Sequence, residues 1–179
     1  MRTLTVTVLL ITVGLAAPAA SQVAPEWCVS STVSPRVYSD NSGHWAQYSS
    51  DEKVPPGDVD TRAYWWKTSN LTLVRITVAI VDDMQKTSEY CYNSSGRLAE
   101  FRYEFWTAWG WGYNERRALN SAGQLTVTQS GFVKIPGGQR IHKPDQAADV
   151  EKSLRPEIYE RLKEMPFAGV RPTMGRGKR

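Results

Sequence analysis

Apolar and polar residues alternate along the middle of the chain with the period of two that half-buried β-strands produce. The clearest alternation runs from Val74 to Val81. The run 62–67 precedes it and is separated from it by Thr-Ser-Asn, so the two runs predict a β-hairpin. Further along, four apolar residues alternate with three charged ones: Ala99, Phe101, Tyr103 and Phe105 against Glu100, Arg102 and Glu104. This pattern predicts a sheet with one packed face and one solvated face.

A turn motif occurs twice in this region. Residues 92–98 (Tyr-Asn-Ser-Ser-Gly-Arg-Leu) return as residues 119–125 (Leu-Asn-Ser-Ala-Gly-Gln-Leu). In both copies Asn-Ser-x-Gly favours a tight turn between extended runs, because glycine, and to a lesser degree asparagine, tolerates positive φ. Two hairpins in series predict an antiparallel meander.

The last part of the chain changes to a helical spacing. Between residues 145 and 165, Val150, Leu154, Ile158 and Leu162 recur every four residues. Pro156 would kink this helix or begin a second one, and Pro166 would end it. We therefore predict an α+β, mainly β fold: an antiparallel meander sheet with a C-terminal amphipathic helix. The helix would cover one face of the sheet, with binding to a membrane surface as the alternative.

The N-terminus has the organisation of a secretory signal. Arg2 is followed by an apolar run, residues 4–15, and by the small-residue stretch 16–20. The apolar run is shorter than the roughly 20 residues that a spanning helix needs, which disfavours a retained anchor. Cleavage leaves about 160 residues, enough for one domain. We expect an exported protein, periplasmic or secreted, with no transmembrane segment after cleavage.

These patterns divide the chain into five segments. Residues 1–20 are the signal peptide, 21–60 a loop-rich segment packed on the domain, 61–143 the β meander, 144–166 the helical segment and 167–179 a basic disordered tail.

The positive charge of the chain is concentrated at its ends. The net charge is +4, but Arg2 leaves with the signal and four cations lie in the last nine residues, so the body carries about −1. A nucleic-acid ligand is not expected, because such binding needs cations spread over the contact face. Weak contact of the tail with an anionic membrane or polymer is the alternative to a solvated end.

The chain has two cysteines, Cys28 and Cys91. An even number in an exported chain favours a disulfide. It would close a loop of about 63 residues and contribute about 4 kcal/mol to stability. No Cys-x-x-Cys unit is present, which disfavours a redox role.

The residues with catalytic potential form no recognisable set. Neither His44 nor His142 has a metal-ligand partner at the usual spacing, and no nucleophile elbow or nucleotide-binding loop occurs. Glu100 and Glu104 would lie about 13 Å apart on a strand, farther than paired glycosidase acids. Pairing with Arg75 or Arg102 accounts better for both. We therefore assign no catalytic residue, metal or cofactor.

The aromatic residues gather in two stretches, residues 64–66 and 101–113. Trp65 and Trp66 are neighbours on a strand and must face opposite sides. Either the N-terminal segment clamped by Cys28 covers the second side, or the surplus rings are exposed for a ligand. Trp65, Trp66, Trp109 and Trp111 are the candidate residues of an aromatic cleft for a glycan or lipid.

The run Tyr90-Cys91-Tyr92-Asn93-Ser94-Ser95-Gly96-Arg97-Leu98 resembles the repeated Tyr-x-Tyr-Asn-x-x-Gly-x-Leu hairpins of small exported bacterial proteins of uncharacterised function. The resemblance covers roughly residues 61–135 and implies no catalytic residues. The leading hypothesis is an exported non-catalytic binding or structural module of the cell envelope or extracellular space, with a glycan, lipid or envelope protein as partner. The alternatives are a glycan- or lipid-binding β domain with an aromatic cleft, and a hydrolase that would bring His44 or His142 to an acid and a serine.

Overall fold

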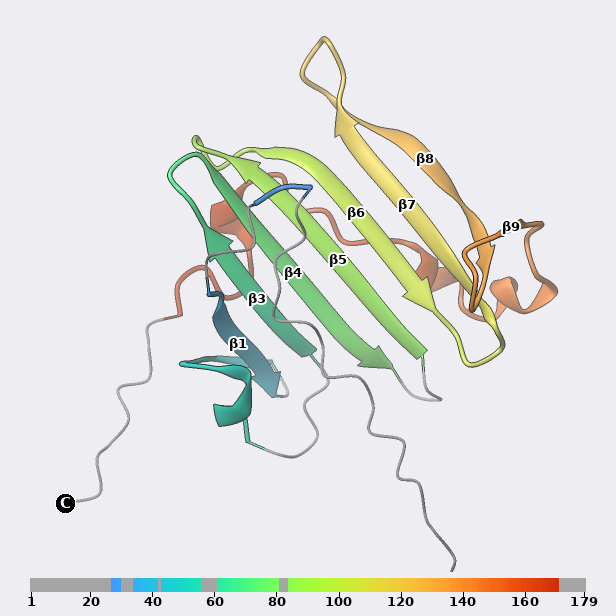
Figure 1. Cartoon of the computed structure of the whole chain (residues 1–179), viewed down its shortest axis with the longest axis horizontal. Helices are drawn as coiled ribbons and strands as arrows, with labels where there is room; N and C mark the ends of the chain where they lie inside the picture. The colour runs from blue at the N-terminus through green and yellow to red at the C-terminus, as the bar shows by residue number, and fades with distance from the viewer. Residues whose placement is uncertain (1–26, 30–33, 42, 56–60, 81–83, 171–179) are drawn as a thin grey trace, which may run out of the picture.

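The computed structural model describes residues 27–29, 34–41, 43–55, 61–80 and 84–170. The predicted signal, residues 1–20, and the basic residues 171–179 lie outside these ranges. The described strands are β1 (Arg36–Asn41), β2 (His44–Tyr48), β3 (Thr61–Lys67), β4 (Leu71–Ile80), β5 (Met84–Asn93), β6 (Leu98–Trp106), β7 (Trp111–Leu119), β8 (Leu125–Lys134) and β9 (Arg140–Ile141). They form one antiparallel sheet in the order β2-β1-β3-β4-β5-β6-β7-β8-β9 (Figure 1). The mainly β fold and the antiparallel meander, from β3 to β9, are confirmed.

The two Asn-Ser-x-Gly motifs form the turns of the β5–β6 and β7–β8 hairpins. Asn93 Oδ1 accepts hydrogen bonds from the backbone N–H groups of Ser95 and Arg97, both at 3.0 Å. Gly96 has a φ of +73°, a conformation that residues with a side chain rarely adopt. Asn120 and Gly123 repeat the same geometry in the second hairpin. Both predicted hairpins are therefore present.

The loop-rich segment 21–60 also contributes strands to the sheet. Its described part forms the β1–β2 hairpin and a single 3₁₀ turn, η1 (Asp51–Lys53). Strand β1 pairs with β3, for example Val37 opposite Tyr64, so the hairpin extends the sheet beyond the meander.

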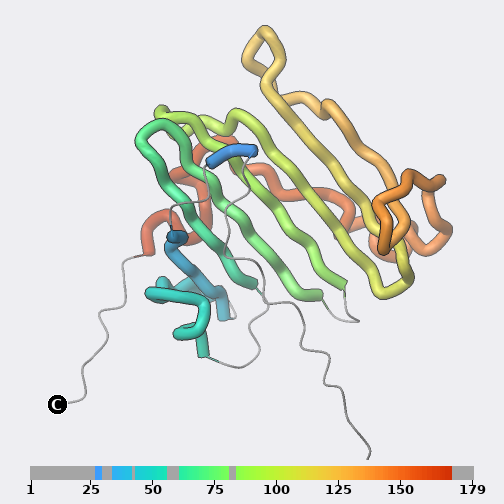
Figure 2. The backbone as a smooth tube through the Cα atoms, viewed as in Figure 1, coloured from blue at the N-terminus to red at the C-terminus, as the bar shows by residue number. Residues whose placement is uncertain are grey.

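One face of the sheet is covered by residues 144–170, which we call the strap (Figure 2). The strap runs behind the sheet from the β9 side to the β1 side. Buried tyrosines anchor it: Tyr90 donates a hydrogen bond to the Glu157 carbonyl at 2.7 Å, and Tyr92 donates one to the Tyr159 carbonyl at 2.9 Å. Phe167, which we placed in the tail, is fully buried against Tyr38. The folded part of the chain thus extends past residue 166.

The predicted C-terminal amphipathic helix is wrong. The strap instead contains three short 3₁₀ turns, η2 (Asp145–Ala148), η3 (Glu151–Leu154) and η4 (Leu162–Glu164). A two-residue turn joins η2 to η3, and the backbone is extended at Arg155 and Arg161, which flank the connection from η3 to η4. In an α-helix the carbonyls of residues 153–160 would bond within the strap. Here four of them bond to the sheet instead: besides the two tyrosine contacts, Tyr103 donates to the Ser153 carbonyl and the Leu98 N–H donates to the Glu160 carbonyl at 2.9 Å. The four periodic residues still pack on the core.

We call the opposite side of the sheet the polar face; it faces the viewer in Figure 1. Its β1–β4 end carries an apolar cluster in which Trp66 is fully buried with Val29 and Cys28. Cys28 is bonded to Cys91 on β5, with an S–S distance of 2.04 Å, which confirms the predicted disulfide. The N-terminal segment around Cys28 therefore covers the second side of β3, which is the first of the two alternatives considered for Trp65 and Trp66. None of the helical turns in the described residues is long and apolar enough to cross a bilayer.

Candidate binding surface

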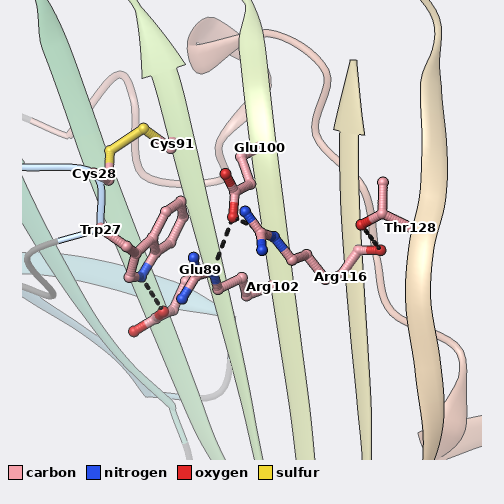
Figure 3. A network of polar contacts seen from close by, with 8 residues as sticks. All are labelled: Trp27, Cys28, Glu89, Cys91, Glu100, Arg102, Arg116 and Thr128. Atoms are coloured by element: carbon pink, nitrogen blue, oxygen red, sulfur yellow. Dashed lines mark hydrogen bonds and ion pairs between the residues drawn. A yellow bond between two sulfur atoms is a disulfide. The ribbon is translucent and has the colours of Figure 1, made fainter. Parts of the chain in front are cut away.

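A row of charged side chains crosses four strands of the polar face. Arg75 on β4, Glu89 on β5, Arg102 on β6 and Arg116 on β7 stand opposite one another in register. Arg75 pairs with Glu89 at 2.8 Å. Arg102 and Arg116 would repel each other, but Glu100 Oε1 lies between them, at 2.9 Å from the first and 2.7 Å from the second (Figure 3). The shared carboxylate fixes both guanidinium groups.

Trp27 lies over one end of this row. Its indole N–H donates a hydrogen bond to Glu89 Oε2 at 3.0 Å, and the Arg102 guanidinium carbon lies 4.0 Å from its ring centroid. The neighbouring Cys28 holds the segment against β5 (Figure 3). The row is thus a rigid platform, since each charged group has at least one partner of opposite charge or an aromatic ring.

Beyond the charged row, a pocket of about 220 Å³ opens on the same face. Glu104 and Trp106 on β6 line it together with Asn114 on β7. The Trp106 side chain is 51% exposed, the largest value among the exposed large hydrophobic residues in the described ranges. Asn114 Oδ1 is buried and has no hydrogen-bond partner. The pocket therefore combines an accessible aromatic ring with polar groups that are not fully engaged within the protein.

The residues 133–138 form the far wall of this pocket. The wall is fixed by backbone hydrogen bonds, from the Ile135 N–H to the Gly110 carbonyl at 2.8 Å and from the Lys134 N–H to the Gln139 carbonyl at 2.8 Å. Gly112 stands opposite Trp106 in register, and because it has no side chain, Ile135 of the wall can pack closely against it. A Cβ atom there would lie 2.6 Å from the Phe105 carbonyl oxygen and 2.9 Å from Ile135 Cδ1.

The pKa of the Glu104 carboxyl is raised above its ordinary value. Desolvation by the surrounding surface is the main cause, and the negative charge of Glu89 adds to it, while a polar contact with Trp106 and the charges of Arg75 and Arg102 oppose it. Perturbed pKa values cluster at functional sites, so this carboxyl is a candidate site residue.

A second cavity, of about 320 Å³, lies between the sheet and the strap. Asp40, whose Oδ1 is buried without a hydrogen-bond partner, lines it with Lys86 and Ser88. The hydroxyls of Tyr90 and Tyr103, which also line it, already donate to strap carbonyls. The pocket on the polar face is the stronger candidate, because it also holds the exposed ring of Trp106.

The four tryptophans predicted to form a cleft do not share one surface. Trp65 is half-buried against Phe167 on the strap face, whereas Trp66 is buried on the polar face. Trp109 is 48% exposed in the β6–β7 turn, with its ring centroid 6.0 Å from that of the buried Trp111. The structure thus brings together only Trp109 and Trp111, and one of that pair is inaccessible.

The residues considered for catalysis are also apart. His44 begins β2 and His142 follows β9; both are exposed, and within the described ranges neither imidazole has a hydrogen bond to an acid or a serine. No group of three His, Cys, Asp or Glu side chains in the same ranges is arranged to hold a metal ion.

Sequence reasoning did not select Trp106 or Asn114. The signal for Trp106 was present, because it continues the alternation that places Glu100, Arg102 and Glu104 on the solvated side of β6. Asn114 carries no comparable signal, since its role depends on the register between β6 and β7, where it stands opposite Glu104.

Comparison with known proteins gives no relative: no family model, curated protein or solved structure matches this chain.

Proposed function

We propose that this protein is an exported, non-catalytic module that binds its partner through the polar face of the sheet. The observation that carries this proposal is the placement of a half-exposed tryptophan, Trp106, beside Glu104 and Asn114 in one pocket. Exposed aromatic rings next to a few polar groups are typical of binding sites, because the ring supplies contact area and the polar groups supply orientation.

Two further observations support export of the protein and a rigid binding surface. The Cys28–Cys91 disulfide suits an oxidising compartment such as the periplasm or the extracellular space. The fixed row of ion pairs next to the pocket would present a preorganised surface, which reduces the entropy lost on binding.

Expression of the full chain in a bacterial host tests the export part. We expect the protein in the periplasmic or extracellular fraction, with a mass reduced by the signal and with no free thiols. Full-length protein in the cytoplasm would contradict export.

The exported protein then tests binding, by intrinsic fluorescence titration with neutral oligosaccharides, phospholipid vesicles and solubilised envelope proteins. Trp106→Ala should abolish the response to whichever ligand binds, and Trp109→Ala should not. If a ligand binds the Trp106→Ala and Arg116→Ala variants with the same affinity as the parent protein, its site lies elsewhere and the proposal is contradicted.

A further inference from the structure

We propose that the pocket beside Trp106 binds a single ring of a neutral sugar; this inference rests on the proposed function and names its ligand class. The pocket is lined on three sides, by Glu104 and Trp106 of β6, by Asn114 of β7 and by the wall 133–138.

The apolar lining fits one face of a sugar ring. Trp106 presents an accessible indole, and Val133, Ile135 and Pro136 supply further apolar surface. The face of an aromatic ring is electron-rich, so it attracts the C–H groups that cover one side of a pyranose. A purely apolar ligand would leave the polar groups of the pocket desolvated and unpaired, which is costly.

The polar lining fits hydroxyl groups. Glu104 supplies an acceptor, and the Asn114 amide supplies both a donor and an acceptor. Hydroxyls donate and accept, so they match both side chains. Asn114 is of particular interest because its oxygen has no partner in the folded protein, and a ligand hydroxyl would provide the missing donor once the amide turns toward the pocket.

The charges of the lining favour a neutral ligand. Glu104 is an anion in the lining, and the positive charges of Arg75 and Arg102 act on its carboxyl from the adjoining row. An anionic ligand would meet Glu104 and a cationic ligand would be repelled by these arginines, whereas a neutral sugar meets no like charge.

The size of the pocket limits what enters it. Its volume of about 220 Å³ lies below the roughly 300–1,000 Å³ that is usual for ligand pockets. One ring fits, and the rest of a longer saccharide would extend over the charged row of Arg102 and Arg116, which lies on the same face.

Isothermal titration of the exported protein with maltohexaose, cellohexaose and chitohexaose tests this inference, with choline and polygalacturonate as charged comparators. We expect at least one of the neutral hexaoses to bind. Trp106→Ala should weaken that binding at least about tenfold, as truncation of an aromatic anchor does, and Trp106→Phe should weaken it less. Asn114→Ala should weaken it several-fold. Trp109→Ala is the matched control, equally exposed but outside the pocket lining, and should change it less than about twofold.

The inference is overturned if none of the three hexaoses binds. It is also overturned if the Trp106→Ala variant unfolds at the same temperature as the parent protein and still binds the hexaose with the same affinity. Tighter binding of choline or polygalacturonate through Trp106 also overturns it. In that last case, or if phospholipid vesicles bind and Trp106→Ala abolishes their binding, the proposed function stands and only the sugar assignment fails.

Discussion

The guanidinium carbon of Arg102 lies 4.0 Å from the centroid of the Trp27 ring, which joins the N-terminal segment to a strand 75 positions later in the chain. The same guanidinium donates to Glu100 at 2.9 Å. Arg102 therefore links the cover of the polar face to the ion-pair row beneath it.

Replacing Arg102 should loosen this link. Arg102→Gln removes the cation from the indole and one partner from Glu100, so we expect the free energy of unfolding to fall by about 1–2 kcal/mol. Urea unfolding followed by circular dichroism measures the change. Arg140→Gln, on the exposed β9, is the control and should stay within about 0.5 kcal/mol of the parent protein. Equal midpoints for the two variants would show that the Trp27 contact contributes nothing.

The disulfide should be a large contributor to stability. It closes a loop of 63 residues, for which the chain-entropy relation gives about 4 kcal/mol. We expect the double variant Cys28→Ser, Cys91→Ser to unfold at markedly lower urea concentration than the oxidised protein. Thiol titration under denaturing conditions should find no free thiol before reduction and two afterwards. Two thiols before reduction would refute the bond.

The strap shows where the sequence pattern was informative and where it was not. Val150, Leu154, Ile158 and Leu162 were expected to face the core, and all four pack against it. Spacing alone could not reveal that the carbonyls between them bond to tyrosine hydroxyls and to β6, because those partners lie about 50 to 67 positions earlier. Tertiary hydrogen bonds thus replaced the local helical ones that the spacing predicts.

The sheet was more predictable because its determinants are local. The Asn-Ser-x-Gly turns fix two hairpins, and the alternation along 98–106 fixes which residues of β6 are buried. The candidate pocket was not predictable, since it depends on the β6–β7 register and on the wall 133–138.

The tyrosine anchors of the strap should make the protein sensitive to alkali. Burial raises the pKa of Tyr90, Tyr92 and Tyr103, and desolvation followed by the adjacent Glu157 raises that of Tyr159 to about 12. A raised folded-state pKa means that the stabilisation is complete below the unfolded-state value of 10 and is lost as the pH rises through the folded-state value. We expect the free energy of unfolding to fall steeply above pH 10, which urea titrations at a series of pH values would measure.

Tyr92→Phe tests the same anchor at neutral pH. The variant leaves the Tyr159 carbonyl without its donor, so unfolding should require about 1 kcal/mol less. Its loss of stability above pH 10 should also be shallower than that of the parent, because one buried phenol no longer ionises on unfolding. An unchanged alkaline profile would mean that the strap does not depend on this hydroxyl.

Gly112 should be required for the wall of the candidate pocket. A methyl group there would lie 2.6 Å from the Phe105 carbonyl oxygen and 2.9 Å from Ile135 Cδ1, so Gly112→Ala should destabilise the fold by roughly 1–3 kcal/mol and displace Ile135. Thermal unfolding and ligand titration measure the two effects. Gly169→Ala is the matched control, because no atom lies within 4 Å of its added Cβ. Comparable behaviour of the two variants would contradict the close approach.

The Glu104 carboxylate should lower the free energy of unfolding at neutral pH. Because its pKa is raised in the folded protein, the folded state holds the proton more tightly than the unfolded state does. The resulting destabilisation is absent below the unfolded-state pKa and is fully present once the pH exceeds the folded-state value. Glu104→Gln should therefore raise the urea midpoint at pH 7, and the gain should shrink as the pH falls through the carboxyl range. Glu160→Gln, on the exposed part of the strap, is the control and should show no such gain. If Glu104→Gln instead lowered the urea midpoint at pH 7, the carboxylate would stabilise the fold, contrary to this prediction. A higher midpoint together with weaker sugar binding would show that Glu104 contributes to ligand binding while it destabilises the folded protein.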